Sequence, residues 1–253
     1  MEVALFPDYT DQELDGKWSC YEKVYVVLVL LIGANSGMVL AQVSDEMLQG
    51  NVDDCENPES NFRRITCSLA TYYFEIKGDF VSALKFNKKA CDLGDRGGCF
   101  NSAFMYYEGR AVKQDYRKAA ELFKKACDLD DALSCFYLGH RYNDGKGVII
   151  DDFKATELYT KACDLGSGTG CFNVGVSYTI GEGVKQDVFK AVEFYTKACE
   201  LDYGPGCNNL GFAYRFGHGV RQNNSKALEY CGKTCDLKVA KGCENYARLK
   251  KSM

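Results

Sequence analysis

The chain has 253 residues, of which 46% are hydrophobic, 26% are charged and three are prolines, and its formal net charge is −4. This composition is that of a folded protein with a sizeable core, and it excludes a largely disordered chain. The negative charge lies in residues 1–41, which hold six acidic side chains and two lysines. The 29 acidic and 29 basic residues that follow leave no basic stripe, so we expect no nucleic-acid partner.

The N-terminal residues have the layout of a secretory signal peptide. Lys23 precedes an apolar run at residues 24–32, and small and polar residues lead from there to Val39-Leu40-Ala41. A positive flank, a short apolar core and small residues before the cut are the parts of such a signal. We therefore predict a signal peptide over residues 1–41, cleaved between Ala41 and Gln42, and a protein exported to the periplasm or secreted.

Two features of this segment fit a signal poorly, because the 22 residues before Lys23 are long and acidic for a positive flank. A start codon assigned too far upstream would explain both. The alternative is an uncleaved membrane anchor. Gly33 and Asn35 interrupt the apolar run, however, and it falls short of the ~20 residues of a span. We expect no membrane span after cleavage.

From residue 67 onward the chain repeats itself with a period of 36 residues. Asp115, Asp151, Asp187 and Asn223 keep this period, and each is followed by Lys-Ala at the third and fourth positions. Cysteine pairs eight residues apart recur with the same offset. These pairs are Cys91/Cys99, Cys127/Cys135, Cys163/Cys171, Cys199/Cys207 and Cys235/Cys243. A fixed period of this length is typical of proteins built from stacked units.

Each unit is predicted to form two helices. Asp187 is a good N-cap, and the apolar residues that follow it fall on one face at spacings of three and four. Residues 171–180 also have apolar residues at helical spacing and stop at Gly181. Two short helices cannot bury their apolar faces alone, so the units must stack. We predict an all-α fold, a right-handed superhelical αα solenoid.

The period also divides the chain into segments. We assign residues 42–66 to an N-terminal cap segment, residues 67–242 to five αα repeats and residues 243–253 to a C-terminal capping helix. The first repeat is shorter than the others because its turn is only Lys77-Gly78-Asp79, and terminal repeats commonly diverge in this way. We expect the solenoid to act as a monomer.

Disulfide bonds are the favoured interpretation of the cysteine pairs. In each pair one cysteine ends a helix and the other begins the next, so a short turn can bring their Cα atoms within the ~4.4–6.8 Å of a bridge. An export signal also implies oxidation. The predicted bridges are Cys55–Cys67, Cys91–Cys99, Cys127–Cys135, Cys163–Cys171, Cys199–Cys207 and Cys235–Cys243.

Two other cysteine chemistries fit the spacing poorly. Zinc sites use closer pairs, and the chain has only His140 and His218 to add to them. Redox catalysis favours two residues between the cysteines, whereas Cys231 and Cys235 are separated by three. We therefore expect neither a metal nor a cofactor. Cleavage after Ala41 would remove Cys20 and leave Cys231 unpaired, either as a buried inert thiol or as a thiol for an intermolecular bridge.

The unit G-x-G-V-x-x-D-x-x-K-A-x-x-x-Y-x-K-A-C-x-L, seen between Gly181 and Leu201, resembles the Sel1-like repeat, a relative of the tetratricopeptide repeat. The cysteines eight apart resemble those of the Helicobacter cysteine-rich protein family. The resemblance implies an exported, disulfide-linked αα solenoid. It also implies either weak β-lactamase and penicillin-binding activity, as described for that family, or protein binding in a concave groove, as in other Sel1-like proteins. A departure is Ala111, which replaces the glycine of the later repeats.

The residues themselves show no complete catalytic motif, so the catalytic residues of any enzyme are unknown. Ser82 and Lys85 match the Ser-x-x-Lys of serine β-lactamases, but Ser-Asp-Asn is absent and Lys233-Thr234 is followed by cysteine instead of glycine. The exposed register of Ser82 and Lys85 in the other repeats indicates a chance match. His140 and His218 do not share a register, and we interpret them as ordinary surface or partly packed residues.

A recurrent amide on the first helix of each pair suggests a binding groove instead. The residues two positions after each trailing cysteine are Asn101, Tyr137, Asn173, Asn209 and Asn245. Such amides can bond an extended peptide or protein segment, or the acetamido groups of a peptidoglycan-like glycan. The alternative is internal capping of neighbouring helices. A secreted effector acting on host cells is a third possibility. The recurrent tyrosines are expected in the core: Tyr106, Tyr107, Tyr142, Tyr178 and Tyr214.

Overall fold

The computed structural model describes residues 45–57 and 63–252, and every regular element in these ranges is a helix. The predicted signal peptide, its cleavage site and Cys20 lie outside the described residues. The helices are α2 (Asp45–Glu56), α3 (Arg63–Ile76), α4 (Phe80–Asp92), α5 (Arg96–Glu108), α6 (Tyr116–Asp128), α7 (Ala132–Asp144), α8 (Asp152–Asp164), α9 (Gly168–Ile180), α10 (Val188–Glu200), α11 (Gly204–Phe216), α12 (Asn224–Asp236) and α13 (Ala240–Ser252).

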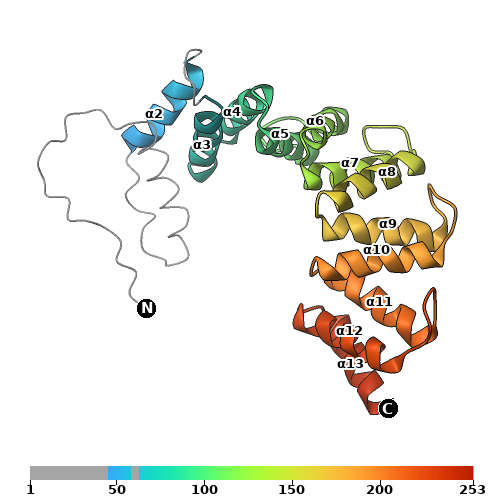
Figure 1. Cartoon of the computed structure of the whole chain (residues 1–253). Helices are drawn as coiled ribbons and strands as arrows, with labels where there is room; N and C mark the ends of the chain where they lie inside the picture. Colours follow the sequence, from blue (N-terminus) through green and yellow to red (C-terminus); the bar gives the residue numbers. More distant parts are fainter. Residues whose placement is uncertain (1–44, 58–62, 253) are drawn as a thin grey trace, which may run out of the picture.

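The helices stack in chain order into a curved solenoid, as the all-α prediction requires (Figure 1). Each helix packs mainly on the helices before and after it in the chain. In addition, α9 contacts α7 and α11, the equivalent helices of the neighbouring repeats. In a curved stack, equivalent helices of neighbouring repeats come closest together on the concave side. The odd-numbered helices therefore form the inner face of the solenoid.

Helix boundaries follow from the recurrent capping residues. The side-chain oxygens of Asp151 and Asn223 accept hydrogen bonds from the N–H groups three residues later, both at 3.0 Å, and so satisfy free donors at the starts of α8 and α12. At the ends of α7 and α9, Gly145 and Gly181 have φ of 71° and 79°. This left-handed conformation suits glycine because a Cβ would be strained there.

Long and short connections alternate along the stack. In Figure 1 the long loops after α7, α9 and α11 project from one edge of the solenoid. The short turns that carry the cysteine pairs lie between an even-numbered helix and the next odd-numbered one, as at Cys163 and Cys171. The loops pack onto the previous repeat. A Cβ on Gly183, for example, would lie 2.0 Å from the carbonyl oxygen of Asp152, so only glycine fits this contact.

The core consists of small residues and rings from facing helices. Ala155, Tyr159 and Val174 form one such cluster, and Ala191, Tyr195 and Leu210 belong to the next. None of the described helices combines the length and apolar character needed to cross a bilayer.

Candidate binding surface

All five residues of the predicted amide ladder lie on odd-numbered helices, which we call the inner face. Asn101 is on α5, Tyr137 on α7, Asn173 on α9, Asn209 on α11 and Asn245 on α13. Asn101 is exposed and the other four are half-buried. The 36-residue period places them at one register because the structure keeps the length of each repeat constant.

The inner face is hollowed beside Asn101. A cleft of about 250 Å³, which we call the inner cleft, opens between α3, α5 and α7. Its lining residues are Glu75, Phe100, Asn101, Phe104, Met105, Glu108, Arg110 and Tyr137. Three aromatic rings, an exposed amide and charges of both signs thus surround one cleft. Arg110 and Glu108 form an ion pair of 3.2 Å at its rim.

The ring of Tyr137 is a fixed wall of this cleft. Its centroid lies 5.4 Å from that of Phe123 in a stacked arrangement and 5.2 Å from that of Phe104 in an edge arrangement. Phe100 adds a third ring at 5.8 Å. Aromatic contacts on several sides hold the ring in place, so a ligand would meet a preformed apolar surface. Sequence reasoning placed Tyr137 on the groove but could not identify its aromatic neighbours.

The amides of the ladder differ in their bonding. Asn173 donates from Nδ2 to the carbonyl oxygen of Thr169 in its own helix at 2.8 Å. Asn245 on α13 donates to Oδ1 of Asn208 on α11, in the neighbouring repeat, at 2.9 Å. The amides of Asn101 and Asn209 make no hydrogen bond within the described part of the chain. A ligand would therefore find these two amides free.

The recurrent tyrosines are half-buried and belong to a ladder of cation–π pairs. A lysine from the first turn of each of the helices α6, α8, α10 and α12 lies over the tyrosine of the preceding helix, at 5.0–5.4 Å from the ring centroid. The pairs are Lys118/Tyr106, Lys154/Tyr142, Lys190/Tyr178 and Lys226/Tyr214. Contacts of this kind are worth about 0.5–1 kcal/mol at exposed sites. The lysines repeat with the period, and each links the two helices of its repeat.

Within the described residues, six disulfides join successive repeats and the N-terminal helix α2, with Cα–Cα distances of 4.4–4.7 Å. They pair Cys55 with Cys67, Cys91 with Cys99, Cys127 with Cys135, Cys163 with Cys171, Cys199 with Cys207, and Cys235 with Cys243. Cys231 is free and buried, and burial raises the pKa of its thiol. Its Sγ faces Gly211, in the place that the Tyr195 ring occupies opposite Gly175.

The residues that resemble catalytic groups have other partners. Ser82 Oγ donates to Asp79 Oδ2 at 2.6 Å, at the helix N-cap, while Lys85 Nζ forms an ion pair with Glu56 at 2.6 Å. His140 is exposed beside Phe136, and His218 lies near Phe212 and Phe216. No group of three or more His, Cys, Asp or Glu side chains in the described ranges is placed to hold a metal ion.

A buried arginine is a feature that sequence reasoning missed. Arg141 is only 3% exposed, and its guanidinium lies 4.6 Å from the ring centroid of Tyr107. It forms an ion pair with Asp144 at 3.2 Å, while its Nε and Nη1 have no hydrogen-bond partner among the described residues. The same register holds Met105, Ser177 and Ala213. The sequence could have indicated this feature, because an arginine stands here at a position that is small or apolar in the other repeats.

Comparison with known proteins identifies the family to which this chain belongs. The model of the Sel1 repeat matches residues 69–95, 97–131, 132–167, 169–203 and 204–239, which is more than half of the chain. The chain belongs to the Sel1 repeat family. Within it, a stretch of 36 residues is 47% identical to HcpC of Helicobacter pylori, a protein provisionally named a β-lactamase. That stretch covers 14% of this chain and 12% of HcpC.

Solved structures of Sel1 repeat proteins have the same fold. The protective antigen c5321 of uropathogenic Escherichia coli has a TM-score of 0.74 and 26% identity to this Sel1 repeat chain, over 82% of this chain and 44% of the antigen. This chain thus spans less than half of that relative. A Sel1 repeat protein from Oxalobacter formigenes has a TM-score of 0.68 and 24% identity, over 89% of this chain and 98% of its own.

Proposed function

We propose that this Sel1 repeat protein is an exported scaffold that binds an extended segment of a peptide or protein on its inner face. Repeat solenoids of this architecture present long surfaces suited to protein binding. The observation that carries the proposal is the inner cleft, which is lined by the free amide of Asn101 and by the rings of Phe100, Phe104 and Tyr137.

The chemistry of the inner cleft suits a polypeptide backbone. An amide offers a donor and an acceptor at once, and this is what an extended backbone presents in return. The rings supply apolar surface for a side chain next to that backbone. Glu108 and Arg110 at the rim can bond polar side chains of either sign. The same amide and rings suit the acetamido group of a peptidoglycan-like glycan, which the experiment below separates from a peptide.

The disulfides support export. Disulfides form and persist in oxidising environments, such as the periplasm or the outside of a cell, and the described residues hold six of them. The signal-like segment before residue 42 agrees with the same compartment.

Peptides selected from a random library on the oxidised protein would test the binding function. We expect selected peptides to bind with micromolar affinity and to lose at least tenfold in affinity when Asn101→Arg fills the cleft. Glu157→Arg, an exposed change on α8, is the matched control and should leave binding unchanged. If the protein bound peptidoglycan fragments but no peptide, the ligand of the inner face would be a glycan and the peptide proposal would be wrong. Equal losses with both variants would contradict the assignment of the inner face.

β-Lactam hydrolysis is the alternative that the name of HcpC suggests. The bonds of Ser82 to Asp79 and of Lys85 to Glu56 hold these two side chains in structural contacts, so we favour binding over catalysis. Turnover of a chromogenic β-lactam that disappears in Ser82→Ala would contradict this preference. Turnover that survives in Ser82→Ala would place a catalytic site elsewhere on the molecule.

A further inference from the structure

A second cleft lies on the edge of the solenoid that carries the long loops. It has a volume of about 900 Å³, and we call it the loop-edge cleft. It opens between the start of α8, the end of α9, the loop 183–187 and the first turn of α10. Its lining residues are Phe153, Tyr178, Gly183, Val184, Lys185, Gln186, Asp187, Val188, Phe189 and Lys190. The inner cleft has no residue in common with it.

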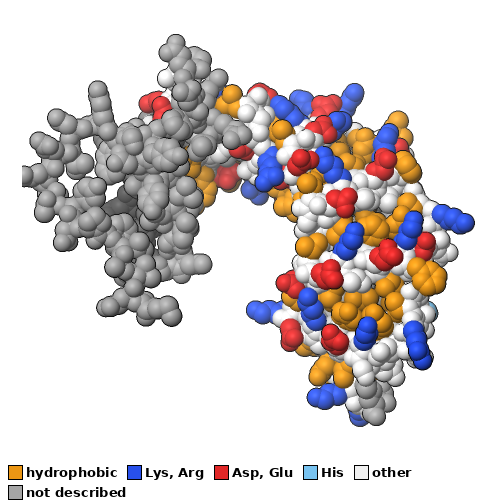
Figure 2. Space-filling view, viewed as in Figure 1, with side chains coloured by type: hydrophobic (Ala, Val, Ile, Leu, Met, Phe, Trp, Pro, Cys, Tyr) orange, Lys and Arg blue, Asp and Glu red, His pale blue; other side chains and the backbone are white. Residues whose placement is uncertain are grey.

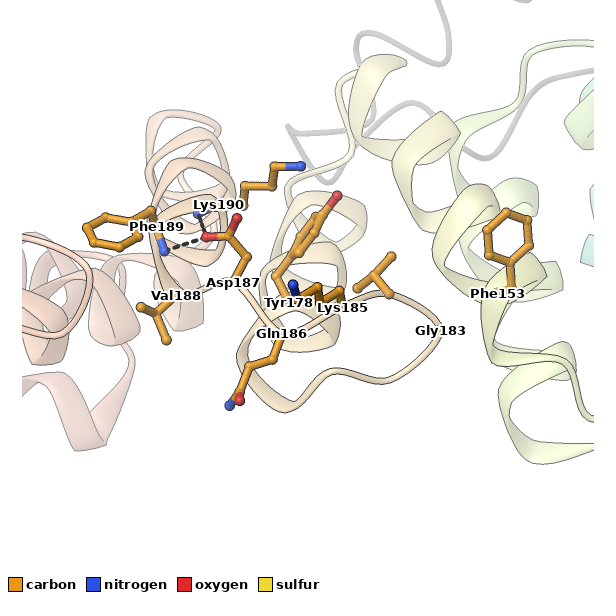
Figure 3. A pocket seen from close by; sticks show the side chains of 10 residues that line it. Phe153, Tyr178, Gly183, Lys185, Gln186, Asp187, Val188, Phe189 and Lys190 are labelled. Carbon is orange, nitrogen blue, oxygen red and sulfur yellow. Dashed lines mark hydrogen bonds between the residues drawn. The ribbon is translucent and has the colours of Figure 1, made fainter.

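Two exposed phenylalanines flank the loop-edge cleft. Phe153 is 61% exposed and Phe189 is 68% exposed. Figure 3 shows them on opposite sides, with Tyr178 and Lys185 between them. They occupy one register, 36 residues apart, where the neighbouring repeats have Arg117 and Ser225. The period of the repeat therefore does not require an aromatic residue at this position, and exposing two of them costs solubility.

Two of the three ionic side chains that line the loop-edge cleft are cations, Lys185 and Lys190, and the third is Asp187. Lys185 and Lys190 are exposed, and neither forms an ion pair with a described residue. Lys190 is held over the ring of Tyr178 at 5.2 Å from its centroid. The lining carboxylate, Asp187, caps α10 through one oxygen: its Oδ1 accepts from the N–H groups of Phe189 and Lys190 at 3.0 and 3.1 Å (Figure 3).

The carboxylates that adjoin lining residues in the sequence, Asp152 and Glu182, also have a hydrogen-bond partner. Glu182 Oε1 and Asp152 Oδ1 both accept from Asn143 Nδ2, at 3.2 and 3.4 Å. A ligand in the cleft thus meets two lysines and apolar rings beside the capped N-terminal end of α10. Charge and apolar surface are complementary to an acidic segment that carries aromatic or branched aliphatic side chains.

We propose that the loop-edge cleft is a second docking site, which binds an acidic, aromatic-containing segment of a partner protein independently of the inner face. The phenylalanines contact the apolar side chains of the segment, and Lys185 and Lys190 pair with its carboxylates. Figure 2 shows hydrophobic side chains between rows of charged ones over the α7–α12 part of the surface, where an extended segment could continue beyond the cleft.

A fluorescein-labelled peptide of alternating aspartate and phenylalanine residues tests this site on the full oxidised chain. We expect anisotropy to show binding that weakens with rising salt, because exposed charges are screened. Lys185→Glu and Phe189→Ser should each lower the affinity at least tenfold. Lys113→Glu is the matched control, since Lys113 has the register of Lys185 in the loop that leads to Arg117, and it should leave the affinity unchanged.

Other outcomes would overturn the proposal. Equal losses in Lys113→Glu and Lys185→Glu would mean that the peptide responds only to overall charge, and equal affinity for a lysine–phenylalanine peptide would remove the ionic selectivity. A dimer in sedimentation that Phe189→Ser dissociates would assign the cleft to a second copy of the chain. Asn101→Arg should not change binding of this probe, so failure here and failure of the inner-face function are distinguishable.

Discussion

Two neighbouring repeats pack the same pair of helices with different residues. Between α9 and α10 the ring of Tyr195 lies against Gly175, where a Cβ would come within 2.6 Å of the ring. The tyrosine hydroxyl is also 2.8 Å from Thr179 Oγ1. Between α11 and α12 the smaller Cys231 takes the place of the ring, and a Cβ on Gly211 would lie 3.3 Å from its Sγ. The glycine is thus a requirement in one repeat and a preference in the next, because the facing residue decides.

The largest effect is expected from the bridges that enter these two repeats. Replacing both cysteines of the Cys163–Cys171 bridge by alanine should lower the free energy of unfolding by about 2.5 kcal/mol, since each bridge restricts a short loop of the unfolded chain. The same change at Cys199–Cys207 should cost a similar amount, because the loops have equal length. Urea denaturation measures both. If the two losses differed by several kcal/mol, the stabilisation by a bridge would depend on local packing and not on the length of the loop it closes.

Gly175→Ala tests the close contact directly. The new methyl group would overlap the ring of Tyr195, and overpacking of this kind costs about 1–3 kcal/mol. Adding Tyr195→Cys, which copies the next repeat, should make the alanine harmless, so the two changes should be strongly non-additive. Thermal melting of the two single variants and the double variant measures this coupling. Simple additivity would mean that the ring is not what excludes the methyl group.

The loops allow a comparison of the same kind at Ala111. This residue has φ of 65°, as Gly147, Gly183 and Gly219 do in the later repeats with φ of 83°, 68° and 70°. An alanine in the left-handed region is strained, so Ala111→Gly should stabilise the protein by about 1 kcal/mol. Ala103→Gly in the middle of α5 is the control and should destabilise it. A loss of stability in Ala111→Gly on chemical denaturation would contradict the strain.

Gly211→Ala should have a small effect. The contact with Cys231 needs a shift of only a few tenths of an ångström, and alanine gains about 1 kcal/mol over glycine in helix propensity. We expect a change within about 0.5 kcal/mol of zero, measured as for Gly175→Ala. If Gly211→Ala lowered the free energy of unfolding as much as Gly175→Ala, the glycine would be required in both repeats and the proposed difference between them would be wrong.

Cys231 should be protected from reagents in the native protein. Burial raises the pKa of its thiol, so at pH 8 alkylation should be at least tenfold slower than in urea. The native thiol keeps its proton at pH values where the unfolded thiol has lost it, so its contribution to stability is full below the unfolded pKa and is lost as pH rises from there through the folded pKa. Mass spectrometry after timed alkylation measures the reaction. Equal rates in native and unfolded protein would place the thiol at the surface.

Much of the fold could be predicted because its signals are local. Helix caps act within a few residues, as at Asp151 and Asn223, and so do the glycines that end helices, as at Gly145 and Gly181. The 36-residue period repeats both kinds of signal along the chain. The candidate sites could be predicted only in part. The register of Asn101 was visible, but the rings that line its cleft come from two helices, α5 and α7. The two lysines of the loop-edge cleft resemble every other surface lysine until the partners of the nearby carboxylates are known.

By itself the sequence determined the helix pairs, their order, the cysteine pairing and the helix that carries each candidate amide, since all of these depend on spacing along one chain. Only the tertiary structure decided which amides are free, where the clefts lie, and that Arg141 is buried while Phe153 and Phe189 are exposed. The physical reason is that a repeat sets the position of each side chain, whereas its burial and bonding depend on what the neighbouring repeat places opposite it.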